Sequence, residues 1–430
     1  MLLPIFFLPL LTSSSALLID TVLKNIIFDP LDRIQALPDN VGAFAAGPED
    51  AQLSTMELIR KYGYNGELHK VTTPDGYILE LHRITGRANS TDSQVQKPVA
   101  FVMHGLLCSS AVWVFAGPEK SLGFLLADAG YDVWLGNARG SLYSREHSHR
   151  RISTAKKDYW NFSWHEIGTL DLPTMIDYVL QTTGREKLFY LGHSQGTTSF
   201  FVMSTQLPEY QEKIEAMFAM APIAYCGRMK SPFLQVFSQF TNTADTLMSL
   251  FGVHEFMPTP NIIQKFMQLM CAEQAMSQPI CSNVMFLIAG FNPDQMDPSM
   301  IPVILGHVPA GASTKQMLHY GQLIRSGARI SPGRFKLFDH GLVSNKKIHN
   351  SRAPPHYELK EIKVPISLHY SENDWLANVK DVEKLYSELG NPYGKFLVPD
   401  KKFNHLDYMW AKDVKPLLYD QILSLMENFK

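Results

Sequence analysis

The pentapeptide Gly-His-Ser-Gln-Gly at 192–196 constrains the fold more than any other feature of the sequence. An apolar run at 188–191 precedes it and a helical pattern at 197–206 follows it, so it lies in a turn between a strand and a helix. Such a tight turn imposes unfavourable backbone angles on its central residue, and the two glycines remove side chains that would collide with neighbouring backbone. The turn would present the Ser194 hydroxyl at a helix N-terminus, where the helix dipole favours developing negative charge. The pattern predicts a nucleophile at Ser194; the alternative is an ordinary serine in a strand-to-helix turn.

Short apolar runs typical of buried parallel strands recur along the chain, with helical patterns between many of them. These runs lie at 99–103, 131–135, 187–191, 216–221, 365–370 and 395–398. Helical patterns lie at 170–180, at 197–206 and in a C-terminal stretch with Val414, Leu418, Ile422 and Leu425 on one face. Runs at 67–73 and 77–84 flank Pro-Asp-Gly, which predicts an antiparallel hairpin where the sheet starts. The alternation predicts an α/β fold with a mostly parallel sheet and flanking helices.

The alternation stops between Pro222 and about Lys346. A helical pattern at 260–270 begins with a capping threonine and a proline suited to the first helical position. Twelve of the 19 methionines lie between Met217 and Met317. We expect a helical cap or lid at 226–345, inserted between two parts of one core at 17–225 and 346–430.

The N-terminal residues 1–16 are typical of a signal peptide, with an apolar core followed by Thr-Ser-Ser-Ser-Ala. The alternative is a buried N-terminal helix, because no basic residue precedes Lys24. The apolar run is shorter than the roughly 20 residues that cross a bilayer, and no later stretch of that length lacks charge. We therefore expect a soluble mature protein in an oxidising compartment, without a transmembrane segment.

The charge balance of the sequence gives little support to nucleic-acid binding. The 430 residues carry 39 Lys+Arg and 41 Asp+Glu, and they form no basic stripe.

Sequons for N-glycosylation occur at Asn89 and Asn161. Asn89 lies in a polar run, so we expect it to be exposed and glycosylated. The aromatic neighbours of Asn161 predict partial burial and leave its occupancy open.

A serine nucleophile needs a base, and the base needs a group that orients it. Asp374 follows the strand-like run at 365–370, and His405 follows the run at 395–398, before the C-terminal helical pattern. Because parallel strands end at one edge of a sheet, both side chains should lie near Ser194, and their chain order is that of serine, acid and histidine. The rival acids are Asp381 and Glu372, and the rival bases are His340, His349, His356 and His369.

Two backbone N–H groups should stabilise an oxyanion at this site. Gln195, directly after the serine, supplies the first. The run at 99–103 ends in His-Gly-Leu-Leu, which makes the N–H of Leu106 the second. His104 and His193 flank the site, and we interpret them as structural rather than catalytic.

Together, these residues give the chain a resemblance to the acid lipase family of animals, which includes gastric lipase and lysosomal acid lipase. The matching segments are Tyr-Gly-Tyr at 62–64, Val-Thr-Thr-Pro-Asp-Gly-Tyr-Ile-Leu at 71–79, His-Gly-Leu-Leu at 104–107, Asp-Val-Trp-Leu-Gly-Asn-Ala-Arg-Gly at 132–140, Tyr-Ser-Arg at 143–145, Phe-Ser-Trp at 162–164, Asp-Leu-Pro at 171–173, the pentapeptide at 192–196, Pro-Ala-Gly at 309–311, Asn-Asp-Trp-Leu-Ala at 373–377 and Asn-His-Leu-Asp at 404–407. The resemblance covers most of the mature chain. It implies an α/β-hydrolase core with a helical cap and lid, which hydrolyses lipid esters at a lipid–water interface without a metal or other cofactor. It implies the same triad and the same oxyanion donors.

The resemblance also implies a lid disulfide between Cys271 and Cys281, which leaves Cys108 and Cys226 free. Cys108 follows the oxyanion loop, so it is either a reactive thiol or a small buried residue, and we favour the second. The segment 338–356 is basic, contains prolines and departs from the vertebrate members.

Other interpretations stay open at this point. A different serine hydrolase, such as an acyltransferase or peptidase, would use the same triad, and a non-catalytic lipid-binding relative would usually have lost one of its members. His147 and His149 could form a metal pair, but only Glu146 offers a carboxylate nearby, so we expect no metal. The resemblance implies an acidic pH optimum. The sequence does not choose between triglycerides and sterol esters, or between an extracellular and a lysosomal destination.

Overall fold

The computed structural model describes residues 48–88, 96–239, 254–256, 285, 286, 288–329 and 333–429. The expected signal peptide at 1–16, the sequon at Asn89, the helical pattern at 260–270 and the cysteines Cys271 and Cys281 lie outside these residues. Within them, no helix is both long enough and apolar enough to cross a bilayer.

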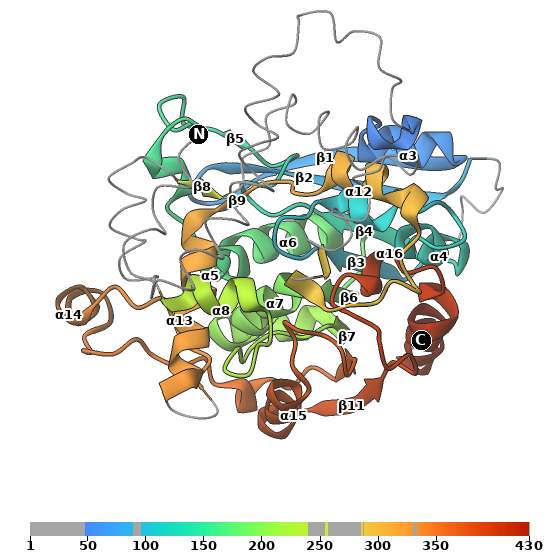
Figure 1. Cartoon of the computed structure of the whole chain (residues 1–430). Coiled ribbons are helices and arrows are strands. Elements are labelled where there is room, and N and C mark those ends of the chain that lie inside the picture. The colour runs from blue at the N-terminus through green and yellow to red at the C-terminus, as the bar shows by residue number, and fades with distance from the viewer. Residues whose placement is uncertain are drawn as a thin grey trace, which may run out of the picture. The chain divides into compact units, whose positions relative to one another are not determined.

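A nine-stranded sheet forms the centre of the described structure (Figure 1). Its strands are β1 Tyr64–Thr72, β2 Tyr77–Arg87, β3 Val99–Met103, β4 Asp132–Gly136, β5 Glu146–His147, β6 Leu188–His193, β7 Ile214–Met220, β10 Ile366–Tyr370 and β11 Pro392–Leu397. The order is β1-β2-β4-β3-β6-β7-β10-β11, with β5 paired to β2. All pairings from β4 to β11 along this order are parallel, whereas β2 pairs antiparallel with β1, β4 and β5. The predicted hairpin and the mostly parallel sheet are confirmed.

The central strands are apolar because both of their faces are covered. Every residue of β3, β4 and β6 is buried. The run predicted as a buried parallel strand at 395–398 belongs to β11, which starts at Pro392 and pairs parallel with β10, but its residues alternate between half-buried and exposed, so the expected burial was wrong. β11 is the edge strand and pairs only with β10, so one side of it meets solvent.

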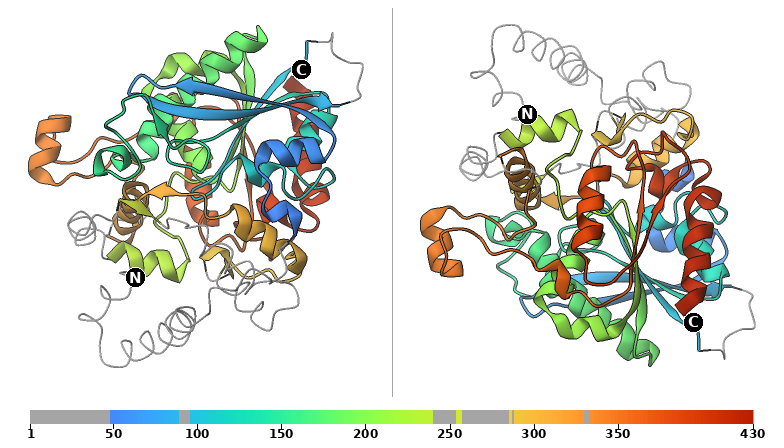
Figure 2. Two further views of the ribbon diagram at one scale, coloured as in Figure 1. Left: turned by 90° about the horizontal axis from the view of Figure 1, so that it is seen from above. Right: turned by 90° about the horizontal axis from the view of Figure 1, so that it is seen from below.

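Helices flank the sheet on both faces (Figure 2), with α6, α7 and α15 on one face and α4 and α17 on the other. The α-helices of the described residues are α3 Thr55–Lys61, α4 Leu122–Asp128, α5 Trp164–Glu166, α6 Leu172–Thr183, α7 Gln195–Gln206, α8 Pro232–Gln239, α12 Ile301–His307, α13 Thr314–Arg329, α14 Leu342–His349, α15 Val379–Glu388, α16 Asp407–Trp410 and α17 Asp420–Met426. The helical pattern predicted at 170–180 corresponds to α6 and a preceding π-helical turn, Ile167–Asp171.

The C-terminal helical face differs from its prediction by one residue. A π-helical turn, Lys415–Tyr419, precedes α17 and inserts an additional residue into the turn. Leu418 and Ile422 are buried as expected, but the next fully buried position is Met426, while Leu425 is only partly buried. The π-helical turn changes the number of residues per turn, so the buried face of the C-terminal helix includes Met426 in place of Leu425.

Between β7 and β10, the described chain adds no strand to the large sheet, which agrees with the predicted interruption of the alternation. This part holds α8, α12, α13, α14 and a small sheet of β8, Glu255–Phe256, with β9, Ala312–Ser313. Glu255 of β8 accepts two hydrogen bonds from the Arg145 guanidinium, at 2.7 and 2.9 Å, which fastens β8 to the core part of the chain. The exact cap boundaries at 226–345 stay a prediction.

Asn161 is exposed, so its expected partial burial was wrong. Its neighbours Trp160 and Phe162 are buried, while the turn between Lys157–Trp160 and α5 directs the Asn161 amide outward. There, the Asn161 side-chain oxygen accepts a hydrogen bond from Lys315 Nζ at 3.1 Å.

Candidate active site

Ser194 lies in the turn between β6 and α7 with φ 52° and ψ −117°, a strained conformation for a residue with a side chain. Its N–H donates to the Met220 carbonyl at 3.0 Å, which anchors the turn to β7. A Cβ added to Gly196 would lie 2.5 Å from the Met103 carbonyl oxygen, and one added to Gly192 would lie 3.0 Å from backbone of the same turn. Both glycines are therefore needed for close backbone packing, as the sequence predicts.

The structure brings Asp374 and His405 together with Ser194 at the carboxyl edge of the sheet. His405 Nε2 lies 2.8 Å from Ser194 Oγ, and His405 Nδ1 lies 2.8 and 3.0 Å from the two Asp374 carboxylate oxygens. All three side chains are buried. This geometry places the ring proton of His405 on Nδ1 and leaves Nε2 to accept the Ser194 hydroxyl proton.

Backbone donors hold the Asp374 carboxylate in place. The N–H groups of Leu376 and Ala377 each donate to Asp374 Oδ1 at 2.8 Å. The carboxylate held in this way fixes the orientation of the His405 ring through its contacts with Nδ1.

The loop with Leu106 lies beside Ser194. A Cβ added to Gly105 would lie 3.2 Å from Ser194 Cβ, so this backbone and the nucleophile are in close contact. Gln195 is the first residue of α7. Neither the Leu106 N–H nor the Gln195 N–H has a hydrogen-bond acceptor in the described part of the chain. Two N–H groups of the loop and the turn thus remain available to a bound oxygen.

Leu107 was not singled out by its sequence, although it has the left-handed angle φ 62° next to Leu106. Its carbonyl accepts a hydrogen bond from Ala310 N–H at 2.6 Å. The Pro-Ala-Gly segment at 309–311 therefore supports the backbone beside the expected oxyanion donor.

His104 and His193 are both buried, and burial lowers their pKa values, that of His104 to about 4 and that of His193 well below its usual range. His104 Nδ1 donates to the Gly105 carbonyl at 2.8 Å, and its Nε2 accepts from Ala138 N–H at 3.2 Å. His193 Nε2 donates to the His405 carbonyl at 3.0 Å. These bonds agree with structural roles for both rings, and the His193 bond supports the loop that carries His405.

The loops that carry Asp374 and His405 are joined by two sets of hydrogen bonds that no local pattern in the sequence predicts. The Ala289 carbonyl accepts from Trp375 N–H at 3.2 Å and from His405 N–H at 3.4 Å, so it links both loops. Asn373 Nδ2 donates to the carbonyls of Phe291 at 2.9 Å and Lys402 at 2.8 Å. A segment far from both loops in the sequence therefore fixes their separation.

Asp407 is a buried carboxyl group two residues after His405. Its Oδ2 atom accepts from Asn404 N–H at 2.8 Å and from Asn292 Nδ2 at 2.7 Å. Burial raises the pKa of Asp407 to about 7, and the negative charges of Asp400 and Asp374 act in the same direction. Asn404 and Asp407 bracket His405, so the protonation state of Asp407 bears on the loop that carries the base.

The rival acids and bases lie elsewhere. Asp381 is on α15, as expected, where it accepts from Arg228 N–H at 2.8 Å, and Glu372 is exposed. His369 lies buried inside β10, where burial lowers its pKa to about 3. His340, His349 and His356 belong to the segment around α14.

The two cysteines of the described residues are small buried side chains rather than reactive thiols. Cys108 and Cys226 are buried and unpaired, and burial raises the pKa of Cys108 to about 12, which agrees with a small buried residue.

The histidine pair at 147 and 149 forms hydrogen bonds within the fold. His147 Nε2 donates to the Asp75 carbonyl at 3.0 Å, while its Nδ1 accepts from His149 N–H at 2.9 Å. Both ring nitrogens of His147 are therefore used in the fold.

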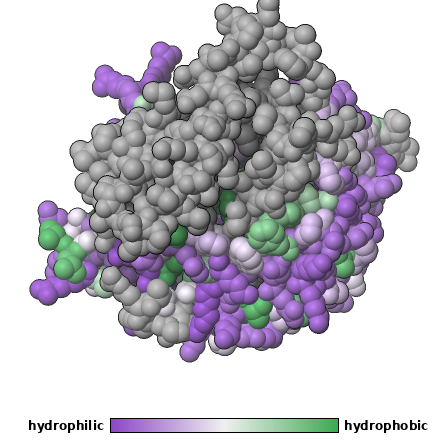
Figure 3. Space-filling model, viewed as in Figure 1, coloured by the Kyte–Doolittle hydropathy of each residue, from purple (hydrophilic) through white to green (hydrophobic). Residues whose placement is uncertain are grey.

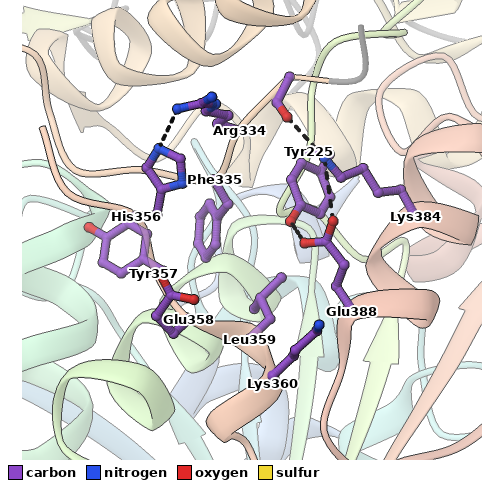
Figure 4. Close-up of a pocket in the computed structure, with 11 residues that line it drawn as sticks. Tyr225, Arg334, Phe335, His356, Tyr357, Glu358, Leu359, Lys360, Lys384 and Glu388 are labelled. Atoms are coloured by element: carbon purple, nitrogen blue, oxygen red, sulfur yellow. Dashed lines mark hydrogen bonds and ion pairs between the residues drawn. The ribbon is translucent and has the colours of Figure 1, made fainter. Parts of the chain in front are cut away.

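A surface pocket of about 560 Å³ is lined by residues from 333–335, 356–360 and α15, together with Tyr225 (Figure 4). None of the predicted site residues lines it. Three of its charged side chains have a hydrogen-bond partner: Arg334 lies 3.2 Å from His356 Nε2, Lys384 donates to the Gly333 carbonyl at 3.0 Å, and Glu388 accepts from the Tyr225 hydroxyl. Among the described residues, no serine, threonine or cysteine lines this pocket, so it offers no nucleophile comparable to Ser194.

Comparison with known proteins identifies the family. Residues 55–117 match the partial alpha/beta-hydrolase lipase region, and residues 98–269 match the alpha/beta hydrolase fold. Lipase 1 of Drosophila melanogaster is 42% identical over 88% of this chain and 80% of its own length. Gastric triacylglycerol lipase of Bos taurus is 38% identical over 91% of this chain and 95% of its own length. Lysosomal acid lipase/cholesteryl ester hydrolase of Homo sapiens is 36% identical over 90% of this chain and 94% of its own length.

The solved structures agree on the fold. A soluble variant of monoglyceride lipase from Saccharomyces cerevisiae, in complex with a substrate analogue, superposes with a TM-score of 0.51 at 14% identity, over 90% of this chain and 99% of that chain. By fold and by sequence, the chain belongs to the α/β-hydrolase lipase family that includes gastric and lysosomal acid lipases, and it is a carboxylic ester hydrolase.

Proposed function

We propose that the chain is a serine lipase or esterase that hydrolyses lipid esters through an acyl-enzyme on Ser194. The single observation that carries this proposal is the 2.8 Å contact between Ser194 Oγ and His405 Nε2. In the first step, His405 accepts the hydroxyl proton while Ser194 Oγ attacks the ester carbonyl carbon. Asp374, bonded to His405 Nδ1, stabilises the imidazolium that forms.

The tetrahedral intermediate carries its negative charge on the former carbonyl oxygen. We assign the N–H groups of Leu106 and Gln195 as its donors, each worth about 3–4 kcal/mol of transition-state stabilisation. Collapse of the intermediate breaks the ester C–O bond, and the alcohol leaves with the proton from His405. Water, deprotonated by His405, then attacks the acyl-enzyme, and the fatty acid leaves while Ser194 regains its proton.

The substrates that we propose are triacylglycerols, sterol esters or both. The names of the bovine gastric and human lysosomal relatives support these two classes of fatty acyl ester. The same relatives support passage through the secretory pathway to the cell exterior or the lysosome. The exposed side chain of Asn161 agrees with glycosylation at that sequon.

Replacing the nucleophile tests the chemistry. Ser194→Ala should lower the turnover of a soluble p-nitrophenyl ester by about 10⁴–10⁶. Ser199→Ala is the matched control, because Ser199 is also buried and lies on α7, and it should stay near wild type. Turnover of Ser194→Ala above about one-tenth of wild type would refute the assignment. Parallel rates on triolein and cholesteryl oleate, at acidic and neutral pH, would then identify the preferred ester.

A further inference from the structure

The helix α14 stands out from the rest of the described chain (Figure 1). We call residues 339–355 the α14 projection. Three of its apolar side chains, Leu342, Val343 and Ile348, are 69%, 73% and 57% exposed. No other large hydrophobic side chain among the described residues is more than 49% exposed. Three strongly exposed apolar side chains on one short helix are unusual for a protein surface, so this exposure needs an explanation.

The α14 projection is held in this form by its own hydrogen bonds. Asn345 is its one buried polar side chain; its Nδ2 donates to Asp339 Oδ1 at 2.7 Å and to the Arg352 carbonyl at 3.1 Å. Asn345 Oδ1 accepts from His340 N–H at 2.9 Å. Gln322 of α13 exchanges two hydrogen bonds with the Asp339 backbone, at 2.8 and 2.9 Å. These hydrogen bonds therefore hold the exposed helix in one geometry.

The charges of the α14 projection are mostly positive. Lys346, Lys347 and Arg352 are exposed, whereas Asp339 is the one carboxylate of the segment. Asp339 Oδ1 already accepts from Asn345 and from Gly341 N–H at 3.0 Å, so its charge is partly satisfied internally. Figure 3 shows hydrophobic residues, in green, beside hydrophilic ones, in purple, at this edge of the molecule.

We propose that the α14 projection docks on a lipid surface with anionic headgroups. Leu342 and Val343 in its first turn, and Ile348 one turn later, would enter the boundary between headgroups and acyl chains. Lys346, Lys347 and Arg352 would meet the anionic headgroups, with their apolar stems lying along the inserted side chains.

The exposed positive charge of the α14 projection favours an anionic lipid surface as its partner, and the distribution of its apolar residues does not fit a protein groove. At 100° per residue, Leu342 and Ile348 lie about 120° apart around the helix axis, with lysines between the apolar positions. The apolar side chains therefore do not form the single continuous stripe that a protein groove takes from a helix. This proposal goes beyond the proposed catalysis, because it concerns how the enzyme reaches aggregated lipid.

Vesicle binding tests the proposal without hydrolysis. Ser194→Ala protein is mixed with phosphatidylcholine vesicles, with or without phosphatidylserine, and the bound fraction is measured by sedimentation. Adding Leu342→Ser and Val343→Ser should lower the partition coefficient by about 10- to 100-fold. Adding Lys346→Gln and Lys347→Gln should lower it by about 10- to 30-fold on anionic vesicles and by less than about twofold on neutral ones.

The matched control carries Leu68→Ser and Leu397→Ser, which remove side chains that are 49% and 44% exposed on other elements. It should bind vesicles like the parent protein. Equal binding by the α14 variants and the control, or no vesicle binding by the parent, would overturn the proposal and leave a protein partner as the occupant. When the same substitutions are made in protein that keeps Ser194, every variant should show wild-type turnover of a soluble ester. Vesicle binding and catalysis are thus measured in separate assays, so failure of one proposal is distinguished from failure of the other.

Discussion

Ser194 and His405 lie in hydrogen-bond contact, 2.8 Å apart, although 211 positions separate them in the chain. The parallel sheet makes this contact possible, because β6 and β11 end at the same edge and each leads into one of the two residues. The intervening chain from α8 to α14 adds no strand to the large sheet within the described residues. Two distant parts of the sequence therefore build one site.

Asp374 should be essential for turnover rather than for binding. Asp374→Asn removes the charge that stabilises the His405 imidazolium and disturbs its tautomer, so kcat should fall by about 10³–10⁴ with little change in KM. Steady-state kinetics on a soluble ester measure this. Glu372→Gln is the control, because Glu372 is a nearby but exposed acid, and it should keep wild-type kinetics. A kcat loss in Glu372→Gln as large as that in Asp374→Asn would contradict the assignment.

Gly196 should not tolerate a side chain. A Cβ at this position would lie 2.5 Å from the Met103 carbonyl oxygen, which is rigid backbone of β3. Gly196→Ala should therefore lower the free energy of unfolding by about 2–4 kcal/mol and displace the Ser194 turn. Urea denaturation and ester turnover check both effects. A variant with wild-type stability and turnover would show that the turn relaxes easily.

Asp407 should make stability depend on pH. Its pKa is raised by burial from an ordinary value of 3.8 to about 7 in the folded chain, so its stabilising contribution is full below about pH 4 and is lost as pH rises through 7. Asp407→Asn removes this titration while keeping an oxygen for the N–H of Asn404. The free energy of unfolding of Asp407→Asn relative to wild type should therefore increase from pH 4.5 to pH 7.5, by the order of a few kcal/mol. Parallel urea titrations at both pH values measure the difference, and a constant difference would contradict a raised pKa.

Cys108 should be inert in the folded protein. Burial excludes reagents from the thiol and raises its pKa to about 12, so little thiolate forms at neutral pH. Iodoacetamide should modify neither Cys108 nor Cys226 in the folded protein, and it should modify both after unfolding. The same sample, digested without reduction and mapped by mass spectrometry, should contain one peptide pair joined by the expected disulfide between Cys271 and Cys281. Rapid alkylation of Cys108 in the folded state would instead identify a reactive thiol beside the oxyanion loop.

Ser194, Asp374 and His405 could be predicted from the sequence because each lies next to a strand or helix that is recognisable from its local residue pattern. The pentapeptide at 192–196 lies between a recognisable strand and helix, and Asp374 and His405 follow recognisable strands. The order of parallel strands then brings all three together. The fold class followed from the same alternation of strands and helices.

Other parts depend on contacts that no local pattern encodes. The Ala289 carbonyl joins the loops of Trp375 and His405 across more than 80 positions, and only the folded chain shows this contact. Met426 replaces Leu425 on the buried C-terminal face because a π-helical turn changes the period of the helix. The exposure of Asn161 depends on the turn that carries it, because its aromatic neighbours are themselves buried.

Reaction with a fluorophosphonate tests the central claim most directly, because this reagent reacts preferentially with an activated serine and forms a covalent adduct on its oxygen. Mass spectrometry of the digested protein should find one adduct, on Ser194, formed in parallel with the loss of ester turnover. His405→Ala should react far more slowly, since Ser194 would lack its base. An adduct on another residue, or full loss of turnover without modification of Ser194, would contradict the account.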